Sequence, residues 1–156
     1  MMQTAEIYSA EVSIEKQLLR LYSSNNYCKE YRVSTSRFGI GHELNSFKTP
    51  TGKFEIEQKI GDGEPLGTVF KGRRTAGIYN FKNQVKEDLI LTRILWLNGL
   101  ENHNKNTFDR YIYIHGTNHL NELGNPHSMG CIRMSNEDII EVYNFLSLGS
   151  KVFIYD

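Results

Sequence analysis

Alternation of apolar and polar side chains is the main pattern along this chain of 156 residues. A strand points successive side chains to opposite faces, so a half-buried strand shows a period of two. This period, together with β-branched and aromatic residues, predicts strands at 6–13, 17–22, 27–34, 53–60, 88–97, 109–115 and 151–155. Short polar breaks separate the first three, which indicates an antiparallel meander.

One segment near the end of the chain has helical spacing instead. Its apolar residues fall on a single stripe: Ile139, Val142, Tyr143 and Leu146. Ser135 is suited to the N-cap, with Asp138 three residues later, and Gly149 is typical of a C-terminal stop. The chain is therefore expected to be mostly β with one substantial helix.

Two stretches lack either period. Residues 36–51 contain Gly39, Gly41 and Pro50, which predicts a loop that borders a groove. Residues 67–87 are mixed and polar, which predicts a long irregular insert or a short helical turn.

Length and composition favour a single domain over residues 1–156, with 39% hydrophobic and 12% aromatic residues to form its core. The 18 basic and 18 acidic residues balance, which argues against a nucleic-acid or anionic-membrane partner. No apolar run is long enough to span a bilayer. Residues 1–10 lack the pattern of an export signal, so we expect a cytoplasmic location, or a periplasmic one if the chain belongs to a longer exported protein.

The two cysteines are too few for a disulfide framework. Cys28 lies in a predicted strand, where a small buried apolar residue is expected. Cys131 instead follows a glycine and lies two residues before Arg133, outside the predicted strands.

The stretch from His115 to Arg133 carries the candidate chemistry. His115 ends a predicted strand, the turn at 124–126 sends the chain back, and Cys131 returns to the same end, although 131 − 115 = 16 residues separate the two. A free thiol has a pKa of about 8.5 and is mostly protonated at neutral pH, so it needs a base or a stabilising cation. A histidine and a cysteine that meet in this way permit nucleophilic acyl transfer.

Two neighbours extend this chemistry. Gly130 has no Cβ, so the amides around it can converge on a developing oxyanion, where one donor is worth about 2.7–4 kcal/mol. Arg133 can bind a carboxylate through two hydrogen bonds.

The order His-Gly, a gap, then Ser-x-Gly-Cys-apolar-Arg resembles the active-site signature of the L,D-transpeptidase catalytic domain, with its YkuD-like, β-sandwich-like fold. Residues 31–36, 49–56 and 149–154 also have counterparts in that family, in this order. The resemblance therefore covers nearly the whole chain.

The resemblance implies a role for each residue of the motif. Cys131 is the nucleophile, His115 its base and the Gly116 carbonyl the group that orients the imidazole. Ser128 and Gly130 shape the nucleophile loop, and Arg133 faces the peptide stem of the substrate. The expected partner is a peptidoglycan stem peptide or muropeptide. It is cut between meso-diaminopimelate and terminal D-alanine through a thioester, with no cofactor and no metal.

Other positions are open to two interpretations. Thr117 and Asn118 reach the groove or build the turn after His115, and Tyr31 lines the groove or packs in the core. Met129 stands where the family usually has a histidine, which is not the base there.

Three alternatives remain at this point. Zinc could be bound by Cys131, His115, His119 and His127, although the usual paired spacings are absent. The domain could bind stem peptides without catalysis, which Met129 favours. The thioester could pass to water, as in an L,D-carboxypeptidase of murein recycling, or to an amine, as in a transpeptidase that forms cross-links or exchanges D-amino acids. The missing export signal favours water.

Overall fold

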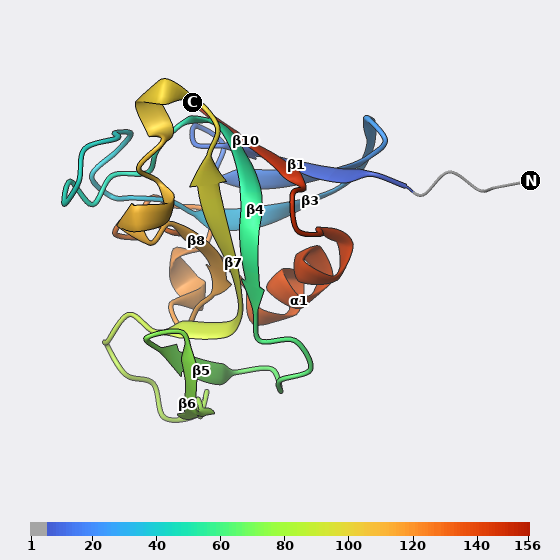
Figure 1. Cartoon of the computed structure of the whole chain (residues 1–156). Coiled ribbons are helices and arrows are strands. Elements are labelled where there is room, and N and C mark those ends of the chain that lie inside the picture. The colour runs from blue at the N-terminus through green and yellow to red at the C-terminus, as the bar shows by residue number, and fades with distance from the viewer. Residues whose placement is uncertain (1–5) are drawn as a thin grey trace, which may run out of the picture.

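The computed structural model describes residues 6–156, and β-strands dominate it (Figure 1). In chain order the strands are β1 Tyr8–Ser13, β2 Leu18–Ser23, β3 Asn26–Ser34, β4 Gly52–Ile60, β5 Thr68–Lys71, β6 Arg74–Ile78, β7 Ile90–Gly99, β8 Tyr113–Gly116, β9 Ile132–Met134 and β10 Lys151–Tyr155. The helix α1 spans Asn136–Phe145, and three short 3-10 helices lie at Asn102–Asn104, Phe108–Arg110 and Leu120–Glu122. The predicted mostly-β fold with one substantial helix is confirmed.

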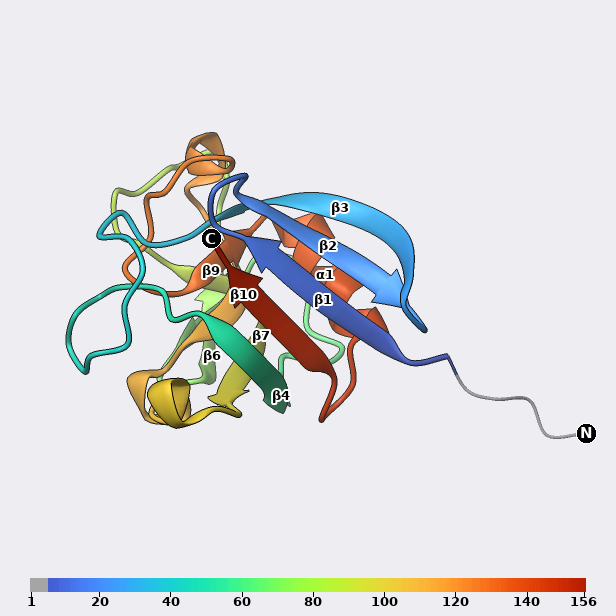
Figure 2. The same ribbon diagram turned by 90° about the horizontal axis from the view of Figure 1, so that it is seen from above.

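The strands form one mixed sheet that closes on itself. Its order is β4-β10-β1-β2-β3-β9-β8-β7-β5-β6, and β4 also pairs with β7. The strands from β4 to β7 therefore make a closed ring, and the β5–β6 hairpin extends beyond it at the bottom of Figure 1. Most neighbours are antiparallel, as in the predicted meander β1–β2–β3, but β1–β10 and β8–β9 are parallel. Figure 2 shows β10, β1, β2 and β3 as one twisted layer with α1 behind it.

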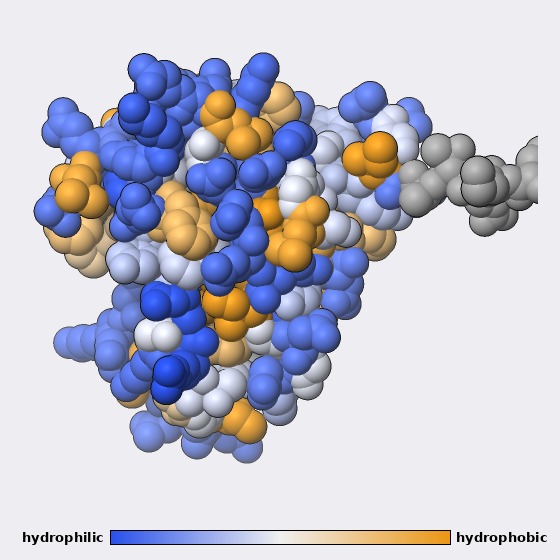
Figure 3. Space-filling view, in the orientation of Figure 1, coloured by the Kyte–Doolittle hydropathy of each residue, from blue (hydrophilic) through white to orange (hydrophobic). Residues whose placement is uncertain are grey.

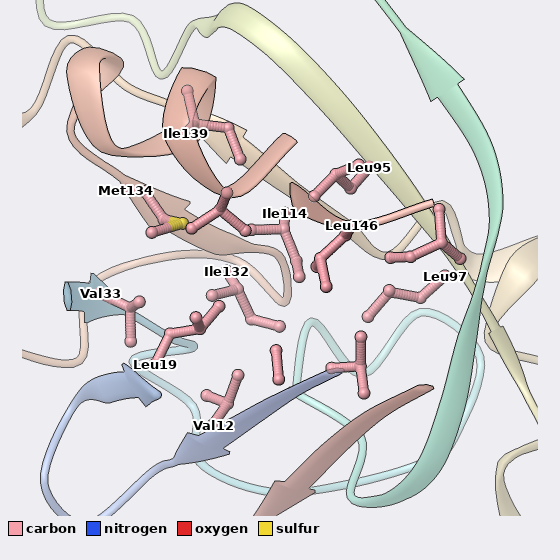
Figure 4. Packing of buried hydrophobic residues seen from close by; sticks show 14 of the residues in the cluster. Val12, Leu19, Val33, Leu95, Leu97, Ile114, Ile132, Met134, Ile139 and Leu146 are labelled. Atoms are coloured by element: carbon pink, nitrogen blue, oxygen red, sulfur yellow. The ribbon is translucent and has the colours of Figure 1, made fainter. Parts of the chain in front are cut away.

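The main core fills the space between this layer and the opposite strands (Figure 4). Val12, Leu19 and Val33 come from the meander and meet Ile114 and Ile132 from β8 and β9. Helix α1 adds the apolar stripe that its sequence predicted, since Ile139, Val142, Tyr143 and Leu146 are all buried. Burial of side chains of this size stabilises the fold by about 1.5–3 kcal/mol each.

Helix α1 begins as predicted and ends early. The Ser135 hydroxyl accepts a hydrogen bond from the Asp138 amide at 3.2 Å, which satisfies one of the free N–H groups of the first turn. The helix stops at Phe145 because Leu146 adopts an extended conformation, so Gly149 lies in the turn before β10.

The prediction for residues 67–87 was wrong in its first half. Residues 68–78 form the β5–β6 hairpin, whose turn residues Gly72 and Arg73 have φ of 55° and 64°. Two central residues with positive φ are the geometry of a tight hairpin turn. Sequence reasoning missed the hairpin because every residue of β6 is exposed and gives no apolar alternation.

The predicted strand 109–115 was wrong at its start. Phe108–Arg110 is a 3-10 helix, and Tyr111 after it has φ of 57°, so β8 begins only at Tyr113. This left-handed residue turns the backbone sharply just before the strand that carries His115.

The prediction for Cys28 was also wrong, since its side chain is exposed. The outer half of β3 projects past the core, and the strand becomes buried only from Tyr31 onward. The alternating sequence of β3 therefore correctly predicts a strand, but in its outer half neither face of that strand is buried.

Hydrophobic side chains on the surface form small separate groups on the face shown in Figure 3. One group lies at the left edge, over the loop between β3 and β4, where Phe38, Leu44 and Phe47 are exposed. Residues 36–51 form the loop that the sequence predicted, apart from isolated bridges at Ser36, Ile40 and Thr49. Among residues 6–156, no helix has the length and apolar character needed to cross a membrane.

Candidate active site

The parallel pair β8–β9 brings the two catalytic candidates to one face of the sheet. Ile114 pairs with Ile132, and both side chains point into the main core. Because side chains alternate, His115 on β8 and Cys131 just before β9 lie on the opposite face. Strand spacing and rise place their Cα atoms on the order of 8 Å apart, diagonally across the two strands. The structure thus brings together two residues that are distant in sequence.

The Cys131 side chain is partly exposed and lies between two backbone groups. Its S–H donates to the carbonyl of Tyr111 at 3.3 Å, and its sulfur accepts from the Tyr113 amide at 3.4 Å. The carbonyl is available because of the left-handed turn at Tyr111. Phe70, Trp96 and Tyr113 form the apolar cluster against which the thiol packs.

This environment keeps the thiol protonated at neutral pH. Burial raises the pKa of Cys131 to about 11, and the Asp88 carboxylate also raises it. The amide of Tyr113 and the cations Arg133 and Arg110 act in the opposite direction. The nucleophile is therefore a neutral thiol at rest and must lose its proton during attack.

His115 is buried and has a defined tautomer. Its Nδ1 lies 2.6 Å from the carbonyl of Gly116, the contact that the resemblance implies. A carbonyl can only accept, so Nδ1 carries the proton and Nε2 of the neutral ring is free to accept one. Burial is the main cause that lowers the His115 pKa below its usual 6.5, so the ring is neutral at pH 7. A neutral imidazole with a free Nε2 is the form that a general base requires.

The nucleophile loop is held by hydrogen bonds from both of its sides. The Ser128 hydroxyl donates to the Cys131 carbonyl and accepts from the Gly130 amide at 3.3 Å. The Thr49 hydroxyl donates to the Gly130 carbonyl at 3.0 Å, which ties the loop to the segment before β4. Gly130 has φ of 122°, a conformation that side chains with a Cβ rarely adopt. The loop thus has the shape-defining residues that the sequence predicted.

Arg133 lies deeper than a substrate-gripping residue is expected to lie. Its side chain is only 1% exposed, and Nη2 lies 2.6 Å from Oδ2 of Asp88, whose own side chain is 37% exposed. Nη1 donates to Nδ1 of His127 at 2.9 Å. Within the described residues, both terminal nitrogens have protein partners, and the buried Nε has none. The role in binding a substrate carboxylate stays a prediction.

Three other predicted substrate contacts are engaged elsewhere. Thr117 is fully buried and accepts from the His119 amide, and Asn118 bonds the backbone of residues 85–89. Tyr31 packs in the main core and donates from its hydroxyl to Glu141 at 2.7 Å. Of the two interpretations, the structure therefore favours the turn for Thr117 and Asn118 and the core for Tyr31.

Met129 is 45% exposed at the edge of a cavity of about 280 Å³. Leu44, Phe47 and Tyr111 line the same cavity. A second cavity, of about 330 Å³, lies between residues 84–86 and residues 118–122, with His127 in its wall.

The four candidate zinc ligands do not form one cluster. His127 binds Arg133, His115 binds the Gly116 carbonyl, and Cys131 binds two backbone groups. Across residues 6–156, no group of three or more histidine, cysteine and acidic side chains is placed to hold a metal ion.

Sequence reasoning missed Asp88, which lies near both His115 and Cys131 in the fold. It precedes the apolar run of β7 and reads as the polar end of a strand. One feature of the sequence does point to such a residue: an arginine in a buried strand needs an acidic counter-ion, as Arg133 does. Nothing in the sequence says which of the 18 acidic residues supplies it.

Comparison with known proteins gives a consistent result. Residues 7–154 match the YkuD family, described as the L,D-transpeptidase catalytic domain. The protein YkuD of Bacillus licheniformis is 27% identical over 148 residues, and YkuD of Bacillus subtilis strain 168 is 28% identical over 148 residues. Each alignment covers 94% of this chain and 65% of the relative, so this chain spans just under two thirds of their length.

Solved structures share the fold at low sequence identity. An L,D-transpeptidase from Mycobacterium smegmatis superimposes with a TM-score of 0.64 at 14% identity, covering 97% of this chain and 59% of that one. L,D-transpeptidase 3 from Mycobacterium tuberculosis, solved with a faropenem-derived adduct, gives 0.63 at 15% identity, covering 99% and 62%. The match over residues 7–154, supported by this fold, shows that the chain belongs to the YkuD family of L,D-transpeptidase catalytic domains.

Proposed function

We propose that the chain transfers the acyl group of peptidoglycan stem peptides through a thioester on Cys131. The observation that carries the proposal is the shared face of β8 and β9, which carries both the thiol and a neutral, oriented imidazole. The family of L,D-transpeptidase catalytic domains supplies the substrate class. The cleaved bond joins meso-diaminopimelate to the terminal D-alanine of a tetrapeptide stem.

The reaction begins with a neutral thiol and a neutral base. The Cys131 side chain turns away from the Tyr111 carbonyl, and Nε2 of His115 takes the proton as sulfur attacks the carbonyl carbon. The protonated imidazole then gives this proton to the nitrogen of D-alanine, which leaves. The thioester that remains on Cys131 is resolved by an acceptor.

A cavity lined by Met129, two residues before the nucleophile, supports a small leaving group. The cavity at Met129 and Tyr111 has about 280 Å³, near the lower end of the roughly 300–1,000 Å³ that is typical of ligand pockets. The larger cavity beside His127 offers room for part of the stem peptide. L,D-transpeptidase 3 from Mycobacterium tuberculosis was solved with a faropenem-derived adduct, which supports the use of a β-lactam to probe acylation of this chain.

For the acceptor we propose water, which makes the enzyme an L,D-carboxypeptidase that shortens tetrapeptides to tripeptides in murein recycling. The cavity of about 280 Å³ at Met129, two residues before the nucleophile, is consistent with water and a single amino acid. The cytoplasmic location expected from the sequence stays a prediction. Transpeptidation is the second candidate, since the family is named for it and the same thioester serves both reactions.

A soluble muropeptide tetrapeptide tests both levels of the proposal. The enzyme is incubated with it and with excess D-methionine, and the products are separated by mass spectrometry. Release of D-alanine by the wild type, absent in Cys131→Ala, supports the thioester. Mostly tripeptide supports water as acceptor, whereas mostly D-methionine-exchanged tetrapeptide or cross-linked dimer supports the transpeptidase. A tetrapeptide left intact would contradict the proposed substrate.

A further inference from the structure

The turn after the catalytic strand β8 holds a second segment in place. Asn118 Oδ1 accepts from the Leu89 amide at 3.0 Å, and its Nδ2 donates to the carbonyls of Glu87 at 2.9 Å and Val85 at 3.2 Å. These bonds lie on both sides of Asp88. His119 Nε2 lies 3.1 Å from the Lys86 carbonyl and adds a fourth contact. In Figure 2 this yellow-green segment lies beside the orange turn that contains these side chains.

Asp88 is the group that this arrangement presents to the site. Its carboxylate lies 2.6 Å from Nη2 of Arg133, and Arg133 pairs with His115 across β8 and β9. Of the salt bridges formed by residues 6–156, this is the only one that Arg133 makes. A buried guanidinium without its carboxylate is costly and shifts position. Anchoring residues 85–89 to the turn after His115 therefore fixes the counter-ion of Arg133 relative to both catalytic groups.

His127 completes the arrangement. A guanidinium can only donate, so Nδ1 of His127 is the acceptor of the 2.9 Å bond. Arg133 is thus held between the Asp88 carboxylate and a ring nitrogen of His127. Among the described residues, Asp88 is the one carboxylate that forms a salt bridge with Arg133.

We propose that Asp88 is a positioning residue of the acyl transfer, held by Asn118, and that it sets the orientation of Arg133 and the charge felt by Cys131 and His115. The catalytic part of this proposal rests on the proposed function, whereas the contacts among Asp88, Asn118 and Arg133 do not depend on it. In the resting enzyme, the Arg133 guanidinium is therefore held by Asp88 and His127, and its role in binding the substrate stays a prediction.

The proposal has a distinctive consequence for pH dependence. Asp88 is one of the causes that raise the pKa of both Cys131 and His115, and Arg133 opposes it at both. The other charged or titratable groups near the site are Arg110, whose guanidinium is bonded to loop carbonyls, Tyr113, whose hydroxyl is bonded to Arg73, and His127, which is bonded to Arg133. Loss of the Asp88 charge leaves Arg133 unbalanced, which favours the thiolate and lowers the thiol pKa.

The test compares Asp88→Asn with Glu87→Gln, a matched control. Glu87 is an exposed neighbour on the same segment, and no hydrogen bond of its carboxylate is recorded among residues 6–156. In a Cys28→Ala background, alkylation of Cys131 by iodoacetamide is followed against pH. Acylation by a carbapenem is followed by intact mass, and each unfolding midpoint is measured.

Asp88→Asn should move the alkylation profile to lower pH, with a rate at pH 8 raised roughly threefold or more. The maximal acylation rate should fall about tenfold because Arg133 is displaced, while the carbapenem concentration for half that rate stays near the wild-type value. Asp88→Glu should restore the alkylation profile, and Glu87→Gln should match the wild type in all three measurements. A general loosening of the fold would also lower the thiol pKa, because it would relieve the burial that raises it, so the unfolding midpoint of each variant separates this case from loss of the Asp88 charge.

Asn118→Ala tests how the carboxylate is held. It should shift the profile in the same direction as Asp88→Asn, and the double variant should be no worse than Asp88→Asn alone, because both act through one contact. Additive effects would contradict that link.

The main proposal is overturned if Asp88→Asn leaves both the alkylation profile and the acylation rate within twofold of the wild type. A wild type that resists acylation would instead contradict the proposed function, and the alkylation profiles would still decide the role of Asp88.

Discussion

The two cysteines of the chain occupy opposite kinds of environment. Cys28 lies on the projecting half of β3, is exposed, and has only the Asn26 carbonyl at 3.5 Å as a hydrogen-bond partner among residues 6–156. Cys131 is partly buried between the Tyr111 carbonyl and the Tyr113 amide, with three charged groups around it and the base His115 on the same face of the sheet. Exposure makes a thiol available to any reagent, whereas acyl transfer needs a base, an orienting carbonyl and a fixed loop. The comparison teaches that the less accessible thiol is the one with catalytic surroundings.

The largest expected effect separates the two cysteines directly. Cys131→Ala should lower D-alanine release from a tetrapeptide by about 10³-fold or more, since the covalent route is lost. Cys28→Ala should leave the rate unchanged, since nothing catalytic surrounds it. Product analysis by mass spectrometry measures both. Equal losses in the two variants would break the comparison.

His115 gives the next largest effect. His115→Ala should slow thioester formation by about 10²-fold or more, because the thiol then has no positioned base. The burst of released D-alanine in rapid-quench experiments measures this step. A loss smaller than tenfold would show that another group takes the proton.

The pH dependence of the acylation rate tests whether the Cys131 thiol and the His115 imidazole are both neutral before attack. The His115 pKa is lowered below 6.5 by burial, so the base loses its function only as the pH falls below that value. Burial raises the Cys131 pKa to about 11, so ionisation of the free thiol does not increase the acylation rate at moderately alkaline pH. We therefore expect acylation rates that are flat between about pH 7 and 9 and fall toward acid. A rate that rises tenfold for each pH unit in this range would indicate attack by a preformed thiolate instead.

Gly130 tests the shape of the nucleophile loop. Gly130→Ala forces a Cβ onto a backbone with φ of 122°, at a cost of about 1–3 kcal/mol in strain. The space itself is adequate, since the nearest atoms lie 3.5 Å from the added carbon. We expect acylation to slow by about tenfold with a modest fall in the unfolding midpoint. Full activity would mean that the loop does not need this conformation.

Met129 gives the smallest expected effect. It is exposed at a cavity rim and contacts neither catalytic group through a hydrogen bond within the described part of the chain. Met129→His should change acylation by less than about threefold. A hundredfold gain would identify the natural protein as an impaired enzyme and favour the stem-peptide-binding module without catalysis.

The strand pattern, the helix and the cysteine–histidine pair could be predicted from the sequence for physical reasons. Alternation survives wherever one face is buried, as in β1 and β4, and the helical stripe of α1 faces the same core. The β5–β6 hairpin escaped because β6 has no buried face, and Cys28 was misplaced because β3 alternates beyond the core.

The partners of the site residues could not be predicted from the sequence. Asp88 reaches Arg133 only because Asn118 ties two segments together, and the sequence separates the members of this ion pair by 133 − 88 = 45 residues. Closure of the sheet by β4 and β7 similarly depends on long-range pairing. The sequence shows which residues have reactive or charged side chains, and the fold determines which of these side chains are already bound to protein groups.

Intact mass after incubation with a carbapenem tests the central claim most directly. The wild type and Cys28→Ala should each gain the mass of one carbapenem, and peptide mapping should place it on Cys131. Cys131→Ala should gain none, although its exposed Cys28 remains available. An adduct on Cys28, or one that persists in Cys131→Ala, would contradict the assignment of Cys131 as the acylated nucleophile.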